Sequence, residues 1–406
     1  MNTELKQQAI EKIIEKWDRK LIENRNEMDF TELTFSSGIP GVVLLLAEYG
    51  LREGFPNYSN KIETYIEYMV YKLSRYGMLT GSIYSGASGI ALSILHLQEQ
   101  PNYHNLFNSL NDYIVYYVEE QIKSIDIDEI SPLDYDIIEG LAGILNYLLL
   151  LNDSHYDEQK VKIVNYLSNL ANMEDKLLKF YIKPNNQMSE LENNVYPKGC
   201  LNLGLAHGLS GVGCVLCYAY RKGFGNNQTL IAIKNILNIY EDFELTDWQP
   251  FIWKDSLTKE EITTNKIIHQ ANFIRDAWCY GSPGISLFYL YSGLILNDTY
   301  LKDKAEKILK ASMDRLYGVD TNMLCHGYTG IIQICSLFKK ILGTNSFNNY
   351  IEEFIGKEDE VIKSFGDDEL EFLEGLSGCL LAFNELEDST KLSYWKQPLL
   401  LFEDFS

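Results

Sequence analysis

Two kinds of apolar pattern alternate along the chain. In the first kind, apolar residues recur every three or four positions, which is typical of an amphipathic helix that covers a core. In the second kind a run is apolar on all sides, and such a helix must itself be buried. The amphipathic segments are residues 1–30, Lys61–Tyr76, Leu106–Ile122, Glu158–Leu170, Thr229–Tyr240, Lys302–Leu316 and Asn349–Ile355. The apolar runs include Val42–Ala47, Ile90–Leu97, Ile144–Leu151, Val212–Tyr220, Ile285–Leu294 and Ile331–Phe338.

A Gly-x-x-Gly turn stands just before each apolar run. The seven turns follow one another at intervals of 48, 54, 68, 73, 46 and 48 residues, which is a long-period repeat. Each repeat therefore contains one polar-faced and one fully apolar helix. The turns are Gly38–Gly41, Gly86–Gly89, Gly140–Gly143, Gly208–Gly211, Gly281–Gly284, Gly327–Gly330 and Gly375–Gly378.

The array of repeats is expected to close on itself. An open solenoid needs a polar outer face on its end repeats, but the first and last repeats here resemble the middle ones. We therefore predict an all-α core in a single domain over residues 1–406. Its fold would be a double-layered α,α toroid of seven inner and seven outer helices, with the glycine turns gathered at one end.

The two longest intervals predict insertions at about 177–199 and 244–272. Both contain aromatic and proline patterns, Val195-Tyr-Pro and Trp248-Gln-Pro among them, that favour strands and loops over helix. The insertions are expected to form either a small accessory module, rich in strand and loop, or two irregular surface loops.

Composition excludes several classes of protein. No uncharged run is long enough to cross a membrane, and residues 1–17 lack the features of a secretory signal. A net charge of -22 argues against nucleic-acid binding and would attract cationic peptides, although it also serves solubility. Seven cysteines without a dense framework favour a reducing, cytoplasmic setting. Cys214 and Cys217 lie in an apolar run and are expected to be core residues.

The strongest candidate site is a metal centre of Cys279, Cys325 and His326. Two thiolates and an imidazole suit tetrahedral zinc, and three protein ligands leave one position open, as in catalytic sites. The spacing is not that of a compact zinc finger, so the prediction depends on the repeat. Closure of the ring would bring the fifth and sixth turns side by side.

Four further residues are candidates for catalysis. His207 stands at the equivalent place in the fourth turn, where it could act as a general acid or base, although a lone histidine beside glycine is more often structural. Asp136 could orient its imidazole, with Asp134 and Glu139 as competitors. Arg275 and Tyr280 flank Cys279. They could bind a substrate carbonyl, or they could serve only in packing.

The donor set also indicates the chemistry. Zinc with two thiolate ligands is a poor Lewis acid for making hydroxide, but coordination removes the proton of a substrate thiol. The resulting thiolate is a nucleophile that requires an electrophile and a proton donor.

These residues carry a family resemblance over essentially the whole chain. The segments WCYGSPG (278–284), CHGYTG (325–330) and AHGLSG (206–211), with the seven turns, resemble the lanthionine cyclases of lantibiotic biosynthesis. The resemblance implies an α,α toroid with an accessory domain and one zinc on Cys279, Cys325 and His326. It implies His207 as the catalytic histidine, assisted by Asp136, with Arg275 and Tyr280 as further site residues.

The implied reaction joins peptide cysteines to dehydroalanine or dehydrobutyrine, forming lanthionine and methyllanthionine rings in a lantibiotic precursor. The chain lacks the large dehydratase region of bifunctional synthetases, so a separate dehydratase is expected to act first. The family precedent is a loose complex with that enzyme and an ABC exporter at the inner face of the membrane.

Two other functions remain open at this point. A zinc-dependent thiol prenyltransferase-like toroid would need a basic diphosphate site, and a carbocation cyclase an Asp-rich box; only Asp367-Asp368 is available. A non-catalytic peptide-binding or thiol-binding scaffold predicts loss of a metal ligand, whereas all three are present.

Overall fold

The computed structural model describes residues 2–174, 177–246, 249–268, 274–387 and 393–405. Seven helices begin at the seven glycine turns, each immediately after the first glycine of its turn. Most of their residues are buried. These inner helices are α2 (Ile39–Gly50), α4 (Ala87–Ser93), α7 (Leu141–Leu148), α10 (Leu209–Arg221), α13 (Ser282–Ile295), α15 (Tyr328–Leu342) and α18 (Leu376–Glu387).

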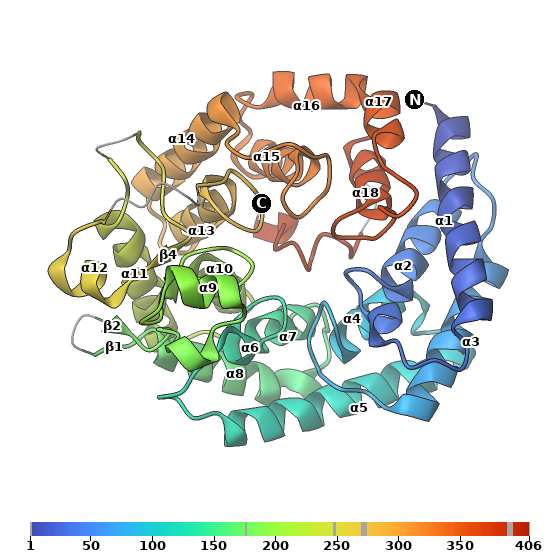
Figure 1. Ribbon diagram of the computed structural model, residues 1–406, viewed down its shortest axis with the longest axis horizontal. Helices are drawn as coiled ribbons and strands as arrows, with labels where there is room; N and C mark the ends of the chain where they lie inside the picture. Colours follow the sequence, from blue (N-terminus) through green and yellow to red (C-terminus); the bar gives the residue numbers. More distant parts are fainter. Residues whose placement is uncertain (1, 175–176, 247–248, 269–273, 388–392, 406) are drawn as a thin grey trace.

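The inner helices form a closed ring (Figure 1). Each packs against the next in chain order, and α18 packs against α2. A second layer surrounds them, with one amphipathic helix or helix pair for each inner helix. The outer helices are α1 (Thr3–Glu23), α3 (Ser59–Tyr76), α5 (Pro101–Ser124), α8 (Asp157–Leu170), α11 (Asn227–Asp242), α14 (Thr299–Arg315), and α16 (Asn348–Gly356) with α17 (Glu358–Lys363). The predicted double-layered α,α toroid is confirmed.

The repeated glycines mark places where no side chain fits. A Cβ atom on the second glycine of a turn would collide with the backbone carbonyl six residues earlier. It would lie 2.2 Å from the Ile83 oxygen at Gly89 and 2.0 Å from the Leu205 oxygen at Gly211. The same contact recurs in all seven turns, which explains why the sequence pattern is so regular.

Backbone hydrogen bonds join the turns to one another. The Cys279 amide donates to the Cys325 carbonyl (3.2 Å), and the Cys325 amide donates to that of Leu373 (3.0 Å). The Leu373 amide donates to the Ser36 carbonyl (3.0 Å), and the Ser36 amide donates to the Tyr84 carbonyl (3.3 Å). These residues all stand two positions before the first glycine of their turns. The turns therefore gather at one end of the ring, as predicted.

The C-terminal segment, residues 394–405, lies inside the ring (Figure 1). Its backbone carbonyls are bonded by side chains of the inner layer. The indole of Trp278 donates to Leu399 (2.8 Å), and the hydroxyl of Tyr291 donates to Leu400 (2.7 Å). This use of the C-terminus was not predicted, because its apolar residues carry no repeat signal.

One predicted boundary was wrong. The first helix ends at Glu23 rather than near residue 30. The buried ammonium group of Lys72 on α3 accounts for the difference, because it binds the Asn24 carbonyl (2.8 Å) and the Glu27 carbonyl (2.6 Å). Carbonyl groups at and beyond a helix end lack helical donors, and the lysine satisfies these two in the non-helical path of the chain.

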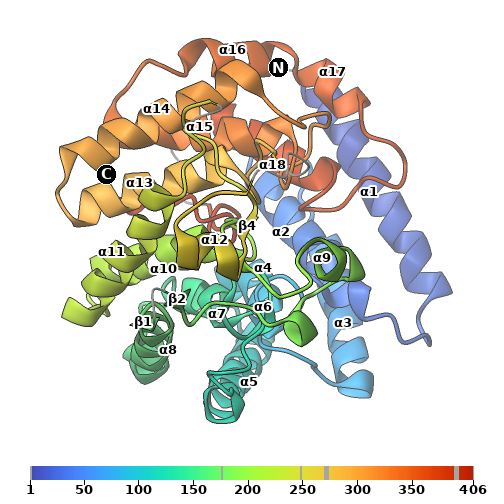
Figure 2. The same ribbon diagram turned by 60° about the vertical axis from the view of Figure 1, so that its left-hand side comes forward.

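The two insertions pack together. Strand β3 (Leu201–Asn202), just after the first insertion, pairs antiparallel with β4 (Ser256–Leu257) in the second. The hydroxyl of Tyr196 also donates to Asp255 (2.8 Å). Helix α12 (Lys259–Thr264) and the hairpin of β1 (Met173–Glu174) and β2 (Leu177–Leu178) lie at the left-hand edge of Figure 1, and Figure 2 brings this side forward. Residues 247–248 and 269–272 of the second insertion, with Trp248 and His269, lie outside the described residues.

The remaining elements are short. They are η1 (Phe30–Leu33), η2 (Leu95–Leu97), α6 (Pro132–Tyr135), η3 (Ser154–Tyr156), β1 (Met173–Glu174), β2 (Leu177–Leu178), η4 (Pro184–Asn186), α9 (Glu190–Val195), α12 (Lys259–Thr264) and η5 (Glu403–Phe405). Among the described helices, none is both long and apolar enough to cross a membrane.

Candidate metal centre

The position just before the first glycine of each turn is occupied by a polar or aromatic side chain. Because the turns are equivalent and gather at one end of the ring, these side chains surround the same mouth. Three of the predicted site residues stand at this position, in three consecutive turns. The seven residues are Ser37, Ser85, Glu139, His207, Tyr280, His326 and Glu374.

The structure brings Cys279, Cys325 and His326 together. Each offers one ligand atom, and these atoms all lie within 4.8 Å of one another. The hydrogen bond from the Cys279 amide to the Cys325 carbonyl holds the two turns side by side. The Cys325 thiol donates to the Cys279 sulfur, which lowers the pKa of Cys279 and raises that of Cys325. Residues 46 positions apart in sequence thus form one compact donor set.

This donor set fits zinc. Two sulfurs and an imidazole nitrogen are ordinary zinc ligands, and the cluster has three members within the described part of the chain. Tetrahedral zinc takes four ligands, so a substrate atom could take the fourth place. The side chain of His326 is 25% exposed, so the cluster can be reached from solvent.

Glu374 lies next to His326. Its Oε1 is 3.8 Å from Nδ1 of His326. The sequence reasoning gave Glu374 no role. Its position in the sequence could have identified it. Glu374 stands just before the first glycine of the seventh turn, as His326 stands just before the first glycine of the sixth turn.

His207 and Asp136 form a hydrogen-bonded pair across neighbouring repeats. The imidazole Nδ1 of His207 lies 2.5 Å from Oδ2 of Asp136, and the Asp136 side chain is fully buried. The imidazole is 25% exposed, so its Nε2 edge remains available to a substrate. Burial by itself lowers the pKa of His207, but the hydrogen bond and the charge of Asp136 outweigh it and raise that pKa.

Asp136, among the three carboxylates considered, is the partner of His207. Its second oxygen, Oδ1, accepts the backbone amides of Ile138 (3.0 Å), Glu139 (2.7 Å) and Gly140 (2.8 Å). The carboxylate is thus fixed by its own turn. Asp134 instead caps α6 at Ser131, and the Glu139 carboxylate is bonded by Ser85.

Tyr280 packs near His207, with a ring-centre separation of 6.5 Å. Its hydroxyl accepts a hydrogen bond from the Asn202 amide (2.9 Å), which leaves the hydroxyl proton free to donate. Burial raises the pKa of Tyr280, so the phenol stays protonated. Asn202 was missed in the sequence, since an asparagine in a short strand carries no motif.

Arg275 is exposed and its charge acts on the candidate ligand Cys279. It is among the groups that lower the pKa of Cys279. Within the described ranges its guanidinium has no hydrogen-bond or ion-pair partner. An unpaired arginine at the mouth can bind a carbonyl or developing negative charge.

Among the residues that the structure describes, no other cysteine or histidine joins this cluster. Cys214 and Cys217 are fully buried in α10, and burial raises the pKa of both thiols. They are core residues, as expected. His96, His104 and His155 lie in or beside helices away from the metal ligands, and burial lowers the pKa of His96 to about 4.

Comparisons with known proteins agree with this fold. The family described as "Lanthionine synthetase C-like protein" matches residues 29–400. The chain is 53% identical over 407 aligned residues to "Nisin biosynthesis protein NisC" of Lactococcus lactis subsp. lactis, covering 100% of this chain and 97% of that protein. The solved structure of "Nisin cyclase" superposes with a TM-score of 0.94 at 53% identity, covering 98% of each chain.

These matches confirm the resemblance stated from the sequence motifs. They exclude the prenyltransferase-like and non-catalytic alternatives, because the match extends over nearly the full chain and includes the site turns. The chain belongs to the lanthionine synthetase C-like family and is an enzyme of thioether ring formation.

Proposed function

We propose that this enzyme closes thioether rings in a dehydrated lantibiotic precursor with one zinc ion held by Cys279, Cys325 and His326. The observation that carries the proposal is the convergence of these three ligand atoms within 4.8 Å at the mouth of the ring. Bound zinc would supply the positive charge that makes a substrate thiol acidic near neutral pH.

The reaction needs two proton movements, and the chain offers groups for both. A cysteine sulfur bonds to the β-carbon of dehydroalanine or dehydrobutyrine, the carbon-carbon double bond is consumed, and the α-carbon gains a proton. His207 donates that proton, or first accepts the thiol proton and then returns it. Its raised pKa favours the protonated imidazole and hence the donor role.

Arg275 and Tyr280 are proposed to bind the carbonyl group next to the double bond. Negative charge develops on this oxygen as sulfur attacks, and the free guanidinium and phenol hydroxyl can both stabilise it. Asp136 is proposed to hold His207 in one orientation, because its own position is fixed by three backbone amides.

The inserted segments are proposed to form an accessory module that contacts the peptide. A pocket of about 270 Å³ joins this region to the site, since His207 and Tyr280 line one side of it. Residues Met188, Leu191 and Val195, in or beside α9, line the other. Met188 and Leu191 expose 46% and 61% of their surface, so they are available to an apolar part of the substrate.

Leu191→Asp should weaken peptide binding at the pocket. Burying a leucine side chain stabilises a complex by about 1.5 kcal/mol or more, so KM for the precursor should rise by about tenfold. The matched control is Ile22→Asp, an 80% exposed apolar residue on α1 outside this pocket, which should leave KM unchanged. Equal KM values for the two variants would contradict a peptide-contacting module.

We further infer that a separate dehydratase prepares the substrate, because the site joins existing double bonds to thiols. Association with that dehydratase and an ABC exporter would place the protein in the cytoplasm, at the inner face of the membrane. Co-purification of the three proteins from membranes tests this. Recovery of this chain without the other two would argue against the complex.

The proposed function is tested with the dehydrated, uncyclised precursor of nisin. We expect purified protein containing about one zinc per chain to make the peptide's thiols unreactive toward an alkylating reagent while the peptide's mass stays unchanged. Mass spectrometry counts the remaining alkylatable thiols. Thiols that remain fully reactive with zinc-loaded protein would overturn the proposal.

A further inference from the structure

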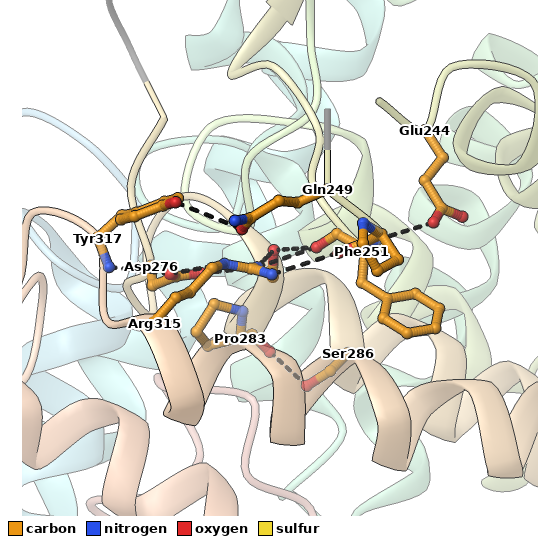
Figure 3. Close-up of polar contacts among 10 residues, drawn as sticks. Glu244, Gln249, Phe251, Asp276, Pro283, Ser286, Arg315 and Tyr317 are labelled. Carbon is orange, nitrogen blue, oxygen red and sulfur yellow. Dashed lines mark hydrogen bonds and ion pairs between the residues drawn. The ribbon is translucent and has the colours of Figure 1, made fainter. Parts of the chain in front are cut away.

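Asp276 and Arg315 form a buried, two-pronged ion pair beside the site (Figure 3). Nε of Arg315 donates to Oδ2 of Asp276 and Nη2 donates to Oδ1, both at 3.0 Å. The Asp276 side chain is fully buried and that of Arg315 is 9% exposed. Paired hydrogen bonds of this kind fix both position and orientation.

The ion pair is directly connected to Arg275. The Asp276 amide donates to the Tyr317 carbonyl (2.8 Å), and the Tyr317 amide donates back to Oδ2 of Asp276 (3.0 Å). These bonds hold the segment that begins with Arg275 against the end of α14. Arg275 has no hydrogen-bond partner of its own among the described residues, so its position depends on this neighbouring attachment.

Gly318 provides the surface on which the Arg275 side chain lies. A Cβ atom at Gly318 would stand 3.6 Å from both Cγ and Nε of Arg275. Gly318 has a φ of +67°, which favours glycine. The Arg275 side chain therefore lies against Gly318, the residue that follows Tyr317, and the ion pair anchors Tyr317.

The same guanidinium binds the second insertion. Nη2 of Arg315 donates to the Phe251 carbonyl (3.0 Å) and to the Ser282 hydroxyl (2.5 Å) at the start of α13. Phe251 has a φ of +63°, and its amide is held by Glu244 (2.8 Å). Figure 3 shows the inserted loop, the turn before Cys279 and the end of α14 meeting at Arg315.

We propose that Asp276 and Arg315 are positioning residues that fix Arg275 beside the metal centre and attach the inserted loop to the same point. This inference rests on the proposed function, in which Arg275 binds the substrate carbonyl. A pair that served stability alone could be replaced by apolar residues of similar volume. An ion pair that holds Arg275 in position needs the planar guanidinium of Arg315, whose two parallel hydrogen bonds lysine cannot reproduce.

The test is a double-mutant cycle on ring formation. Arg315→Lys is made in the wild-type chain and in Arg275→Ala, and kcat/KM is measured with the dehydrated precursor of nisin. We expect a loss of about tenfold in the wild-type background and less than about twofold when Arg275 is absent, since residues that act through one another are not additive. Equal losses in both backgrounds would overturn the inference.

Binding supplies a second readout. The dissociation constant of the fluorescently labelled dehydrated precursor, measured without added thiol reagents by anisotropy, should rise with Arg315→Lys only where Arg275 is present. The zinc content of Arg315→Lys should stay at the wild-type level. Loss of zinc would show general damage to the site and would contradict a specific role of Arg315 in positioning Arg275. If Arg315→Lys does not fold, Asp276→Asn enters the same cycle, because it keeps the side-chain shape and removes the charge.

Lys72→Arg is the matched control. Lys72 and Glu32 form another buried ion pair, 3.1 Å apart and both 1% exposed, between α3 and η1 in the outer layer. This change should lower the melting temperature and leave kcat/KM the same in both backgrounds. If Arg275→Ala alone leaves ring formation unchanged, the proposed role of Arg275 is wrong. If Arg275→Ala is impaired but Arg315→Lys is additive, only the positioning inference is wrong.

Discussion

A Cys325→Ala variant is expected to lose its zinc and its ring-forming activity together. The cluster offers three ligand atoms among the described residues, so removal of the Cys325 sulfur leaves only two of them. Loss of an outer-shell partner of a metal ligand already costs about 10–100-fold in affinity, and loss of a ligand itself should cost more. Elemental analysis of the purified protein measures zinc, and alkylation of the dehydrated precursor of nisin measures ring formation.

The matched control for this variant is Cys335→Ala. Cys335 lies on α15, the helix that follows Cys325, and its thiol is buried in the core. Its removal creates a small cavity and should cost stability without loss of metal. Ring closure by a Cys325→Ala protein free of zinc would refute the zinc mechanism.

Most of the fold could be predicted because one physical constraint is repeated seven times. At Gly89, Gly211 and their equivalents a carbonyl group stands too close for any side chain, so glycine recurs at a fixed place before each buried helix. Once the repeat is recognised, closure of the ring brings Cys279 and Cys325 together. Their hydrogen-bonded turns are the result of that closure.

The parts that escaped prediction depend on single contacts without a period. Asn202 reaches Tyr280 from a two-residue strand, and Arg315 reaches Asp276 from the last residue of an amphipathic helix. No motif or spacing in the sequence distinguishes Asn202 or Arg315 from the many other polar residues of the chain. The C-terminal segment is similar, because Leu399 and Leu400 are held through their carbonyl groups, which every residue possesses.

Asp136 was predicted only in part, because the repeat indicated its region but a single contact decided which carboxylate binds His207. Its position near the third turn made it a candidate, but Asp134 and Glu139 also stand close to that turn in sequence. Only the direction of the chain at the turn decides among them, and the structure shows three amides pointing at one Asp136 oxygen while the other faces His207.

His207→Ala should keep its zinc and lose ring formation. His207 is not one of the three clustered ligands, so metal content should equal that of the wild type. A positioned general acid or base contributes about 10²–10⁴-fold to a rate, and kcat should fall by that factor. Thiol addition that persists should lose control over which face of the α-carbon receives the proton, which chiral analysis of the hydrolysed lanthionine detects.

The pH dependence separates the acid role of His207 from a merely structural one. The pKa of His207 is raised because the bond to Asp136 and its charge outweigh burial. The imidazole is therefore charged below this pKa, and kcat should fall as the pH rises through it if His207 donates the proton. Asp136→Asn removes the charge and weakens the hydrogen bond, which are the two largest causes that raise this pKa, so the fall should move to lower pH. A pH profile that is identical in wild type and Asp136→Asn would show that His207 does not donate the proton in the step that limits kcat.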